Sequence, residues 1–102
     1  MRIIQKLSDM ISEEISDAAK YADCALKHKD DNPPLADTFY RLSTEEMQHM
    51  NMLHEQVARI IKAYREEKGE PPAEMMAVYN YLHGKQIDSA AEVKAKQLLY
   101  KG

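Results

Sequence analysis

The sequence predicts an all-α fold, and three observations support this prediction. The 102 residues include only three glycines and four prolines, the two residue types that most disfavour helix. Ala, Leu, Met, Glu, Lys and Gln, which favour helix, are abundant. Apolar residues recur in alternating steps of three and four along two long segments, which is the periodicity of helices packed in a bundle.

Two strong breaks and one weaker break divide the chain. Asn32-Pro33-Pro34 and Gly69-Glu70-Pro71-Pro72 are the strong breaks, and Gly84 is the weaker one. The predicted helices are residues 3–29, 35–68, 73–83 and 88–100, the last with an N-cap at Asp88-Ser89. We expect one domain, in which residues 1–69 form a long helical hairpin and residues 70–102 add two shorter C-terminal helices.

Charged and polar residues interrupt both apolar stripes near their centres. The first stripe is Ile4, Leu7, Ile11, Ala18, Tyr21 and Ala25. The second stripe is Phe39, Leu42, Leu53, Ile60 and Ala63. Glu14 occupies the missing position of the first stripe, and Glu46, His49 and Gln56 occupy those of the second. The interruptions therefore lie where neighbouring helices should meet.

These interruptions predict a metal site. Burying carboxylates without a compensating cation is costly. Glu46 and His49 are three residues apart and share a helix face, and Glu14 on the antiparallel neighbour is placed to meet them. Carboxylate oxygens with an imidazole nitrogen suit Fe, Mn or Zn.

A second copy of the chain would complete such a site. The helix at 35–68 would be about 50 Å long, and two short C-terminal helices would leave part of the hairpin uncovered. Pairing two hairpins into a four-helix bundle would bury that face, so we expect a homodimer or a higher even oligomer. The dimer would gather four carboxylates and two imidazoles, which two divalent cations would balance.

The segment from Phe39 to His49, continuing to Leu53, resembles the second helix of ferritin-like proteins, rubrerythrin especially. Glu14 precedes Glu46 by 32 residues, a spacing similar to that of the superfamily, and the resemblance covers roughly the first 65 residues. Residues 70–102 hold no second Glu-x-x-His motif. In this the chain is similar to encapsulated ferritins, which build the site across a dimer interface. The resemblance does not extend to enclosure in a protein shell.

The resemblance implies a di-iron carboxylate centre, with two Fe ions per dimer and Mn or Zn as other occupants. Glu46 would bridge the ions, and Glu14 and His49 would be terminal ligands. Tyr21 resembles the tyrosine that many ferritins place near the metals, where it tunes the site or supplies an electron. The implied partners are Fe(II) and O2 or peroxide, and the implied reaction is of the ferroxidase type. Whether the chain is an enzyme stays open.

Two other interpretations remain open. In the first, the chain is a metal-free helical structural or interaction module with a degenerate ferritin-like fold, in which the three polar residues hydrogen-bond among themselves. In the second, the methionines near His49 form a copper site with His54, although methionine commonly fills cores. The residues of this second interpretation are Met47, Met50, Met52 and His54.

Composition excludes several other functions. The net charge of −3 and the lack of a basic cluster argue against nucleic acid as a partner. No run of about 20 apolar residues predicts a membrane span. The single Cys24 fits a reducing cytoplasm.

Two further residues have expected roles outside the three predicted ligands. His83 is expected near the C-terminal end of a helix, where the helix dipole favours a cation. Asp17 is expected to be either an acid at the edge of the metal site or a solvated surface residue.

Overall fold

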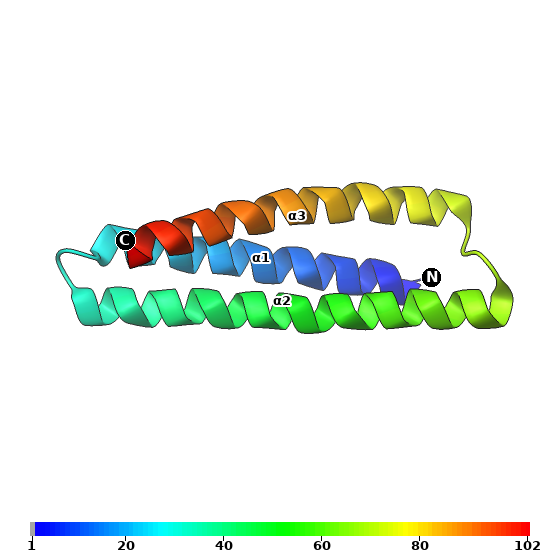
Figure 1. Ribbon diagram of the computed structural model, residues 1–102, viewed down its shortest axis with the longest axis horizontal. Coiled ribbons are helices and arrows are strands. Elements are labelled where there is room, and N and C mark those ends of the chain that lie inside the picture. Colours follow the sequence, from blue (N-terminus) through cyan, green and yellow to red (C-terminus); the bar gives the residue numbers. More distant parts are fainter. Residues whose placement is uncertain (1) are drawn as a thin grey trace.

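The structure is a computed structural model that describes residues 2–102, and these residues form three helices and no strand. The helices are α1 (Arg2–His28), α2 (Pro33–Lys68) and α3 (Ala73–Lys101). They run side by side, and the C-terminus lies near the turn between α1 and α2 (Figure 1). The all-α prediction is confirmed. None of these helices reaches the length and hydropathy that crossing a bilayer requires.

Local interactions set the limits of α2 at both strong breaks. At the start of α2, the side-chain oxygen of Asn32 accepts a hydrogen bond from the Leu35 N–H at 3.4 Å. Pro33 fits the first helical position, where its missing N–H would have no partner in the helix. At the other end, Gly69 adopts a φ of 84°, and its N–H donates to the Arg65 carbonyl at 3.1 Å. This left-handed conformation favours glycine.

The weaker break at Gly84 does not exist, so the prediction of two shorter C-terminal helices is wrong. α3 is one helix of 29 residues, and Asp88 and Ser89 lie inside it. A single glycine costs a helix only about 1 kcal/mol relative to alanine. Packing of α3 just beyond Gly84 offsets this cost, since Gln86 and Val93 are buried. The continuous helix returns along much of the hairpin (Figure 1).

The core lies along α1, which packs against both other helices, whereas α2 and α3 hardly contact each other. The molecule measures 55 × 19 × 18 Å, and its longest dimension agrees with the length of α2. The core residues are Ile4, Ile11, Ile15, Ala18, Met47, Val57, Ile61 and Val93. α1 is therefore covered from two sides by helices of its own chain.

The buried stripe is displaced from the predicted one. On α1, Ile4, Ile11, Ala18 and Ala25 are buried as expected, but the positions between them are filled by Ser8, Ile15 and Ala22. The residues expected there, namely Leu7, Glu14 and Tyr21, are only half-buried. The cause is α3, which packs on one side of the hairpin. The residues of α1 that face both α2 and α3 are therefore the ones that become buried.

The same displacement occurs on α2. Its buried residues are Ala36, Ser43, Met47, Val57 and Ile61. None of the predicted stripe residues is fully buried: Phe39, Leu42, Leu53 and Ile60 are half-buried, and Ala63 is exposed. The predicted stripe thus forms the edge of the core, on a side of the hairpin that α3 leaves uncovered.

Buried side-chain hydrogen bonds fix the register of the helices. The amide nitrogen of Gln86 donates to the Ser8 carbonyl at 3.0 Å and to the Ser12 hydroxyl at 2.9 Å, which ties α3 to α1. The Ser43 hydroxyl donates to the Ala18 carbonyl at 2.7 Å, which ties α2 to α1. A slip of one helix turn would move Ser43 and Gln86 away from these partners and leave their polar groups unpaired.

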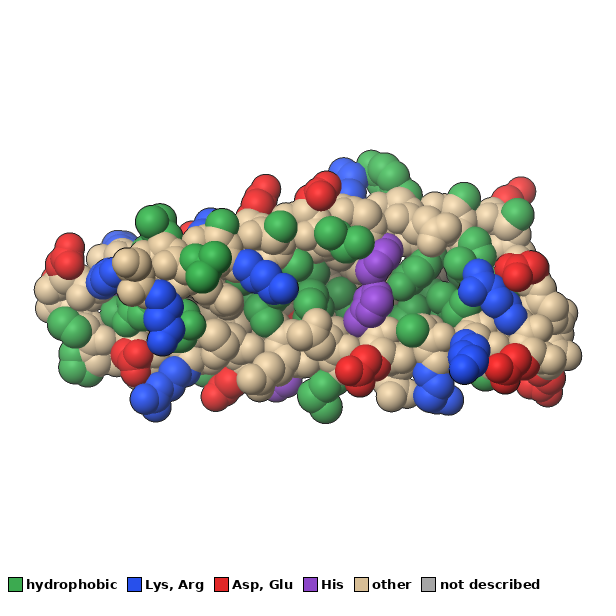
Figure 2. All heavy atoms as spheres, viewed as in Figure 1, with side chains coloured by type: hydrophobic (Ala, Val, Ile, Leu, Met, Phe, Trp, Pro, Cys, Tyr) green, Lys and Arg blue, Asp and Glu red, His purple; other side chains and the backbone are tan. Residues whose placement is uncertain are grey.

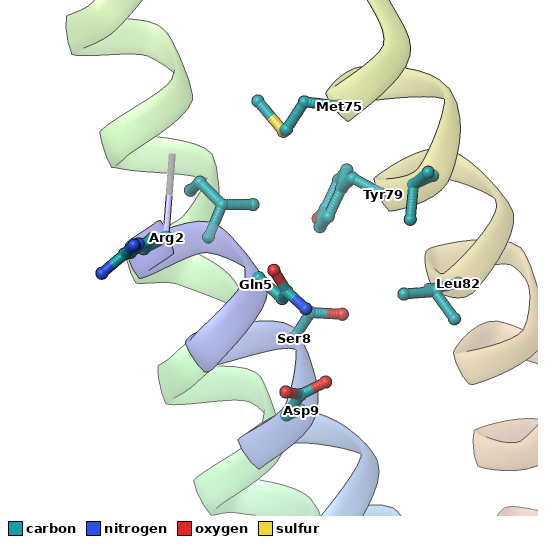
Figure 3. A pocket seen from close by; sticks show the side chains of 9 residues that line it. Arg2, Gln5, Ser8, Asp9, Met75, Tyr79 and Leu82 are labelled. Carbon is teal, nitrogen blue, oxygen red and sulfur yellow. The ribbon is translucent and has the colours of Figure 1, made fainter.

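A pocket of about 290 Å³ lies between the first turns of α1 and of α3. In Figure 3, the α1 side offers the polar side chains of Gln5, Ser8 and Asp9, and the α3 side offers Met75 and Tyr79. No residue that the sequence predicts as a metal ligand lines this pocket. It is separate from the site described next.

Candidate metal centre

Glu14 of α1 and Glu46 and His49 of α2 lie together, with one ligand atom of each within 4.8 Å of the others. The Nδ1 atom of His49 is 3.5 Å from Glu14 Oε2 and 3.7 Å from Glu46 Oε2. The structure therefore brings together the three residues that the sequence predicts as ligands. We call these three residues the Glu-Glu-His triad.

The geometry of the triad follows from helix spacing and from the register of α1 and α2. Glu46 and His49 are three residues apart, so they lie on one face of α2. Glu14 meets them because α1 runs antiparallel to α2, and the hydrogen bond from Ser43 to Ala18 fixes that register one turn away. Helix spacing thus places Glu46 and His49 on one face of α2, and the register of the two helices brings Glu14 to them.

The triad lies at the edge of the core. The side chains of Glu14 and Glu46 are 25% and 19% exposed, whereas that of His49 is 54% exposed. The Oε2 atom of Glu14 is buried and has no hydrogen-bond partner. Such an atom is costly unless a cation or a donor meets it, which matches the demand of a metal site.

The electrostatics of the triad appear in the pKa of Glu46, which lies above its ordinary value. The first cause is a hydrogen bond with the carboxyl group of Glu14, followed by burial and by the Glu14 charge. His49 opposes the rise, and Asp17 adds to it. Two carboxylates therefore share a space in which one of them resists ionisation, and a divalent cation would relieve this repulsion.

The triad faces away from α3. Ser12 of α1 and Asn51 of α2 line pockets whose other walls come from α3. Glu14 and His49 are each two residues from these positions, which corresponds to about 200° around a helix. Both therefore point to the side of the α1–α2 hairpin that no other helix within residues 2–102 covers.

Tyr21 and Asp17 lie near the triad to different degrees. Tyr21 is two turns from Glu14, about 10 Å along the helix, and its ring stacks on Phe39 with centroids 6.2 Å apart. It is not part of the triad. Asp17 is one turn from Glu14, and its charge acts on Glu46. The spacing of three residues from Glu14 is the sequence signal for this influence.

A sequence model of the rubrerythrin family matches residues 6–99. The chain belongs to the rubrerythrin family. This family has the ferritin-like helical fold, and its domains typically bind iron. The match reaches across α3, beyond the first 65 residues that carry the resemblance seen in the sequence. No curated protein and no solved structure gives a significant match to the chain.

Proposed function

We propose that this rubrerythrin-family chain handles iron through half of a di-iron carboxylate site, held by Glu14, Glu46 and His49 and completed by a second copy. The observation that carries the proposal is the Glu-Glu-His triad on the uncovered side of the hairpin. The donor set fits iron, because two carboxylates and one imidazole are ligands that it accepts. The buried Oε2 atom of Glu14 makes no hydrogen bond, although His49 Nδ1 lies 3.5 Å from it.

Each residue of the triad has a distinct part in binding. Following the family resemblance, all three residues would hold the ions: Glu46 would be the ligand shared between them, and Glu14 and His49 would each bind at one end. Because the pKa of Glu46 is raised, its proton must leave as the cation binds, so affinity increases with pH. The two bound ions would supply the oxidation of Fe(II) by O2 or peroxide, with Fe(II) as the substrate.

The surroundings of the triad support a second copy as partner. Apolar side chains line the same side of the hairpin at helical spacing from the triad: Ile3, Leu7 and Met10 on α1, and Leu35, Leu42, Leu53 and Ile60 on α2. Ile3 is 47% exposed, and Met10 and Leu35 are each 37% exposed. A two-fold dimer would cover these residues and gather four carboxylates and two imidazoles. The α1 and α2 helices would form its four-helix bundle, with α3 outside.

Anaerobic titration with Fe(II), followed by exposure to oxygen, tests this function. We expect about one iron per chain and oxidation faster than in buffer. The double variant Glu46→Ala, His49→Ala should lose both, whereas Glu45→Ala, which changes the exposed neighbour of Glu46, should retain them. Mn(II) and Zn(II) suit the same ligands and are titrated in parallel. No iron binding by the wild-type chain would contradict the proposal.

The alternative is a metal-free helical interaction module. It is supported by the proximity of the Glu14 and Glu46 carboxyl groups and by the contacts of His49 with both, through which the triad partly satisfies itself. Under this alternative, Glu46→Ala with His49→Ala leaves stability and oligomer mass unchanged in the presence of metal. Under the iron-handling proposal, metal raises the melting temperature of the wild type but not that of the double variant.

A further inference from the structure

A second histidine cluster lies on the other side of the hairpin, between α2 and α3. The rings of His54 and His83 are stacked with centroids 4.6 Å apart and planes at 22°. Tyr79 stacks on His83 with centroids 5.6 Å apart. Figure 2 shows histidine side chains meeting between these helices, with hydrophobic side chains beside them. His83 is therefore not at a helix end, as expected from the sequence, but inside α3 and in contact with α2.

Three buried polar atoms of this cluster have no hydrogen-bond partner: His54 Nε2, His83 Nδ1 and Gln86 Oε1. Gln86 is only 7% exposed. Its orientation is determined, because its amide nitrogen must donate to the Ser8 carbonyl, which leaves Oε1 without a donor. Buried polar atoms in folded proteins are nearly always paired, so this group of three points to a ligand.

The three residues share a pocket of about 170 Å³. Its lining residues are Ile11, Met50, Asn51, His54, His83, Gln86, Ile87 and Ala90. None of these side chains is acidic, and Met50 adds a thioether sulfur to the wall. Burial and the neighbouring His54 lower the pKa of His83, which favours the neutral imidazole that a metal ion requires.

We propose that this pocket is a Cu(I) site, in which His54 Nε2 and His83 Nδ1 are the ligands and Gln86 Oε1 or the Met50 sulfur completes the coordination. Neutral imidazole and thioether groups suit a soft ion. A pocket without a carboxylate favours a monovalent ion over a divalent one, because less charge remains uncompensated. One of the two stacked rings must turn so that both nitrogens face the ion. The χ2 torsion of histidine has a broad distribution, which permits this rotation.

This site is independent of the Glu-Glu-His triad. Asn51 lines the pocket, whereas His49, two residues earlier, points about 200° away around α2. Met50 and His54, two residues of the copper interpretation of the sequence, both line the pocket. Met47 is in the core and Met52 is exposed, so these two do not contribute. The missing ligand is His83, which α3 supplies.

Anaerobic titration of the full chain with Cu(I), against a chromogenic Cu(I) chelator, tests the proposal. We expect one Cu(I) per chain, and a loss of affinity of roughly tenfold or more in His54→Phe and in His83→Phe. Phenylalanine preserves the stacking while it removes the ligand nitrogen. His28→Phe is the matched control, because His28 also stacks on an aromatic ring, that of Phe39. A parallel set carries Cys24→Ser, since a thiol also binds Cu(I).

Imidazole 15N NMR of the wild-type chain gives a second readout that does not depend on whether the variants fold. Cu(I) should shift His54 Nε2 and His83 Nδ1, and should leave both nitrogens of His28 unchanged. Equal Cu(I) affinity in wild type and in both phenylalanine variants would overturn the proposal. So would shifts confined to His49, or a preference of this pocket for Zn(II) over Cu(I).

Discussion

Glu46 makes the stability of the metal-free chain depend on pH. The hydrogen bond with Glu14 and burial raise its pKa above the ordinary value of 4.5, so the folded chain holds a proton that the unfolded chain has released. The stability from this proton is fully present below pH 4.5 and is lost as the pH rises through the folded-state pKa. A divalent cation at the triad would relieve the repulsion that contributes to this raised pKa.

Replacing Glu46 by glutamine should remove this dependence. In the presence of a chelator, we expect the difference in unfolding free energy between Glu46→Gln and wild type to grow with pH, to about 1 kcal/mol in favour of the variant. Urea unfolding between pH 4 and pH 8 measures it. Glu45→Gln, at the exposed neighbouring position, should follow the wild type. A difference that does not change with pH would contradict the assigned cause.

At the scale of single residues, the sequence predicts the triad but not the histidine pair. Glu46 and His49 are recognisable because their spacing is local and both interrupt an apolar stripe. Contact between His54 and His83 depends on how α3 lies along α2, which only the tertiary structure determines. With α3 divided at Gly84, His83 falls at a predicted helix end, and a capping role is the natural interpretation.

At the scale of helices, the glycines of α3 and of its preceding turn should respond in opposite ways to alanine. Gly84 lies inside α3, with nothing within 4 Å of an added Cβ, so Gly84→Ala should raise the unfolding free energy by about 0.5–1 kcal/mol. Gly69 has a φ of +84°, so Gly69→Ala should lower it by about 1 kcal/mol. Thermal unfolding of both variants measures these changes, and a destabilised Gly84→Ala would contradict a regular helix there.

The helices of the hairpin are predictable because their limits are chemical. Asn32 and the following prolines begin α2, and Gly69 ends it, whatever the rest of the chain does. Gly84 misleads because its cost of about 1 kcal/mol is within the range that tertiary packing overcomes. The displaced stripes have the same origin, since Ser8 is buried where Gln86 of α3 bonds to it.

At the scale of the whole molecule, the uncovered side of the hairpin should control association. We expect metal-loaded wild type to have twice the mass of one chain, and Met10→Lys, on the triad side of α1, to remain monomeric. Leu98→Lys is the control, because Leu98 is 72% exposed on α3. Light scattering with and without metal measures the mass. Equal association of both lysine variants would exclude this side of the hairpin as the interface.

The unequal contacts of the three helices also imply an order of local opening. Because α3 packs on α1 and hardly contacts α2, it can separate from the hairpin as one cooperative unit while α1 and α2 stay paired. Amide hydrogen exchange should therefore be fastest in α3 and slowest in α1, where two neighbours protect the backbone. Glu14, Glu46 and His49 would then belong to the segment of the chain that unfolds last, and His83 to the segment that unfolds first.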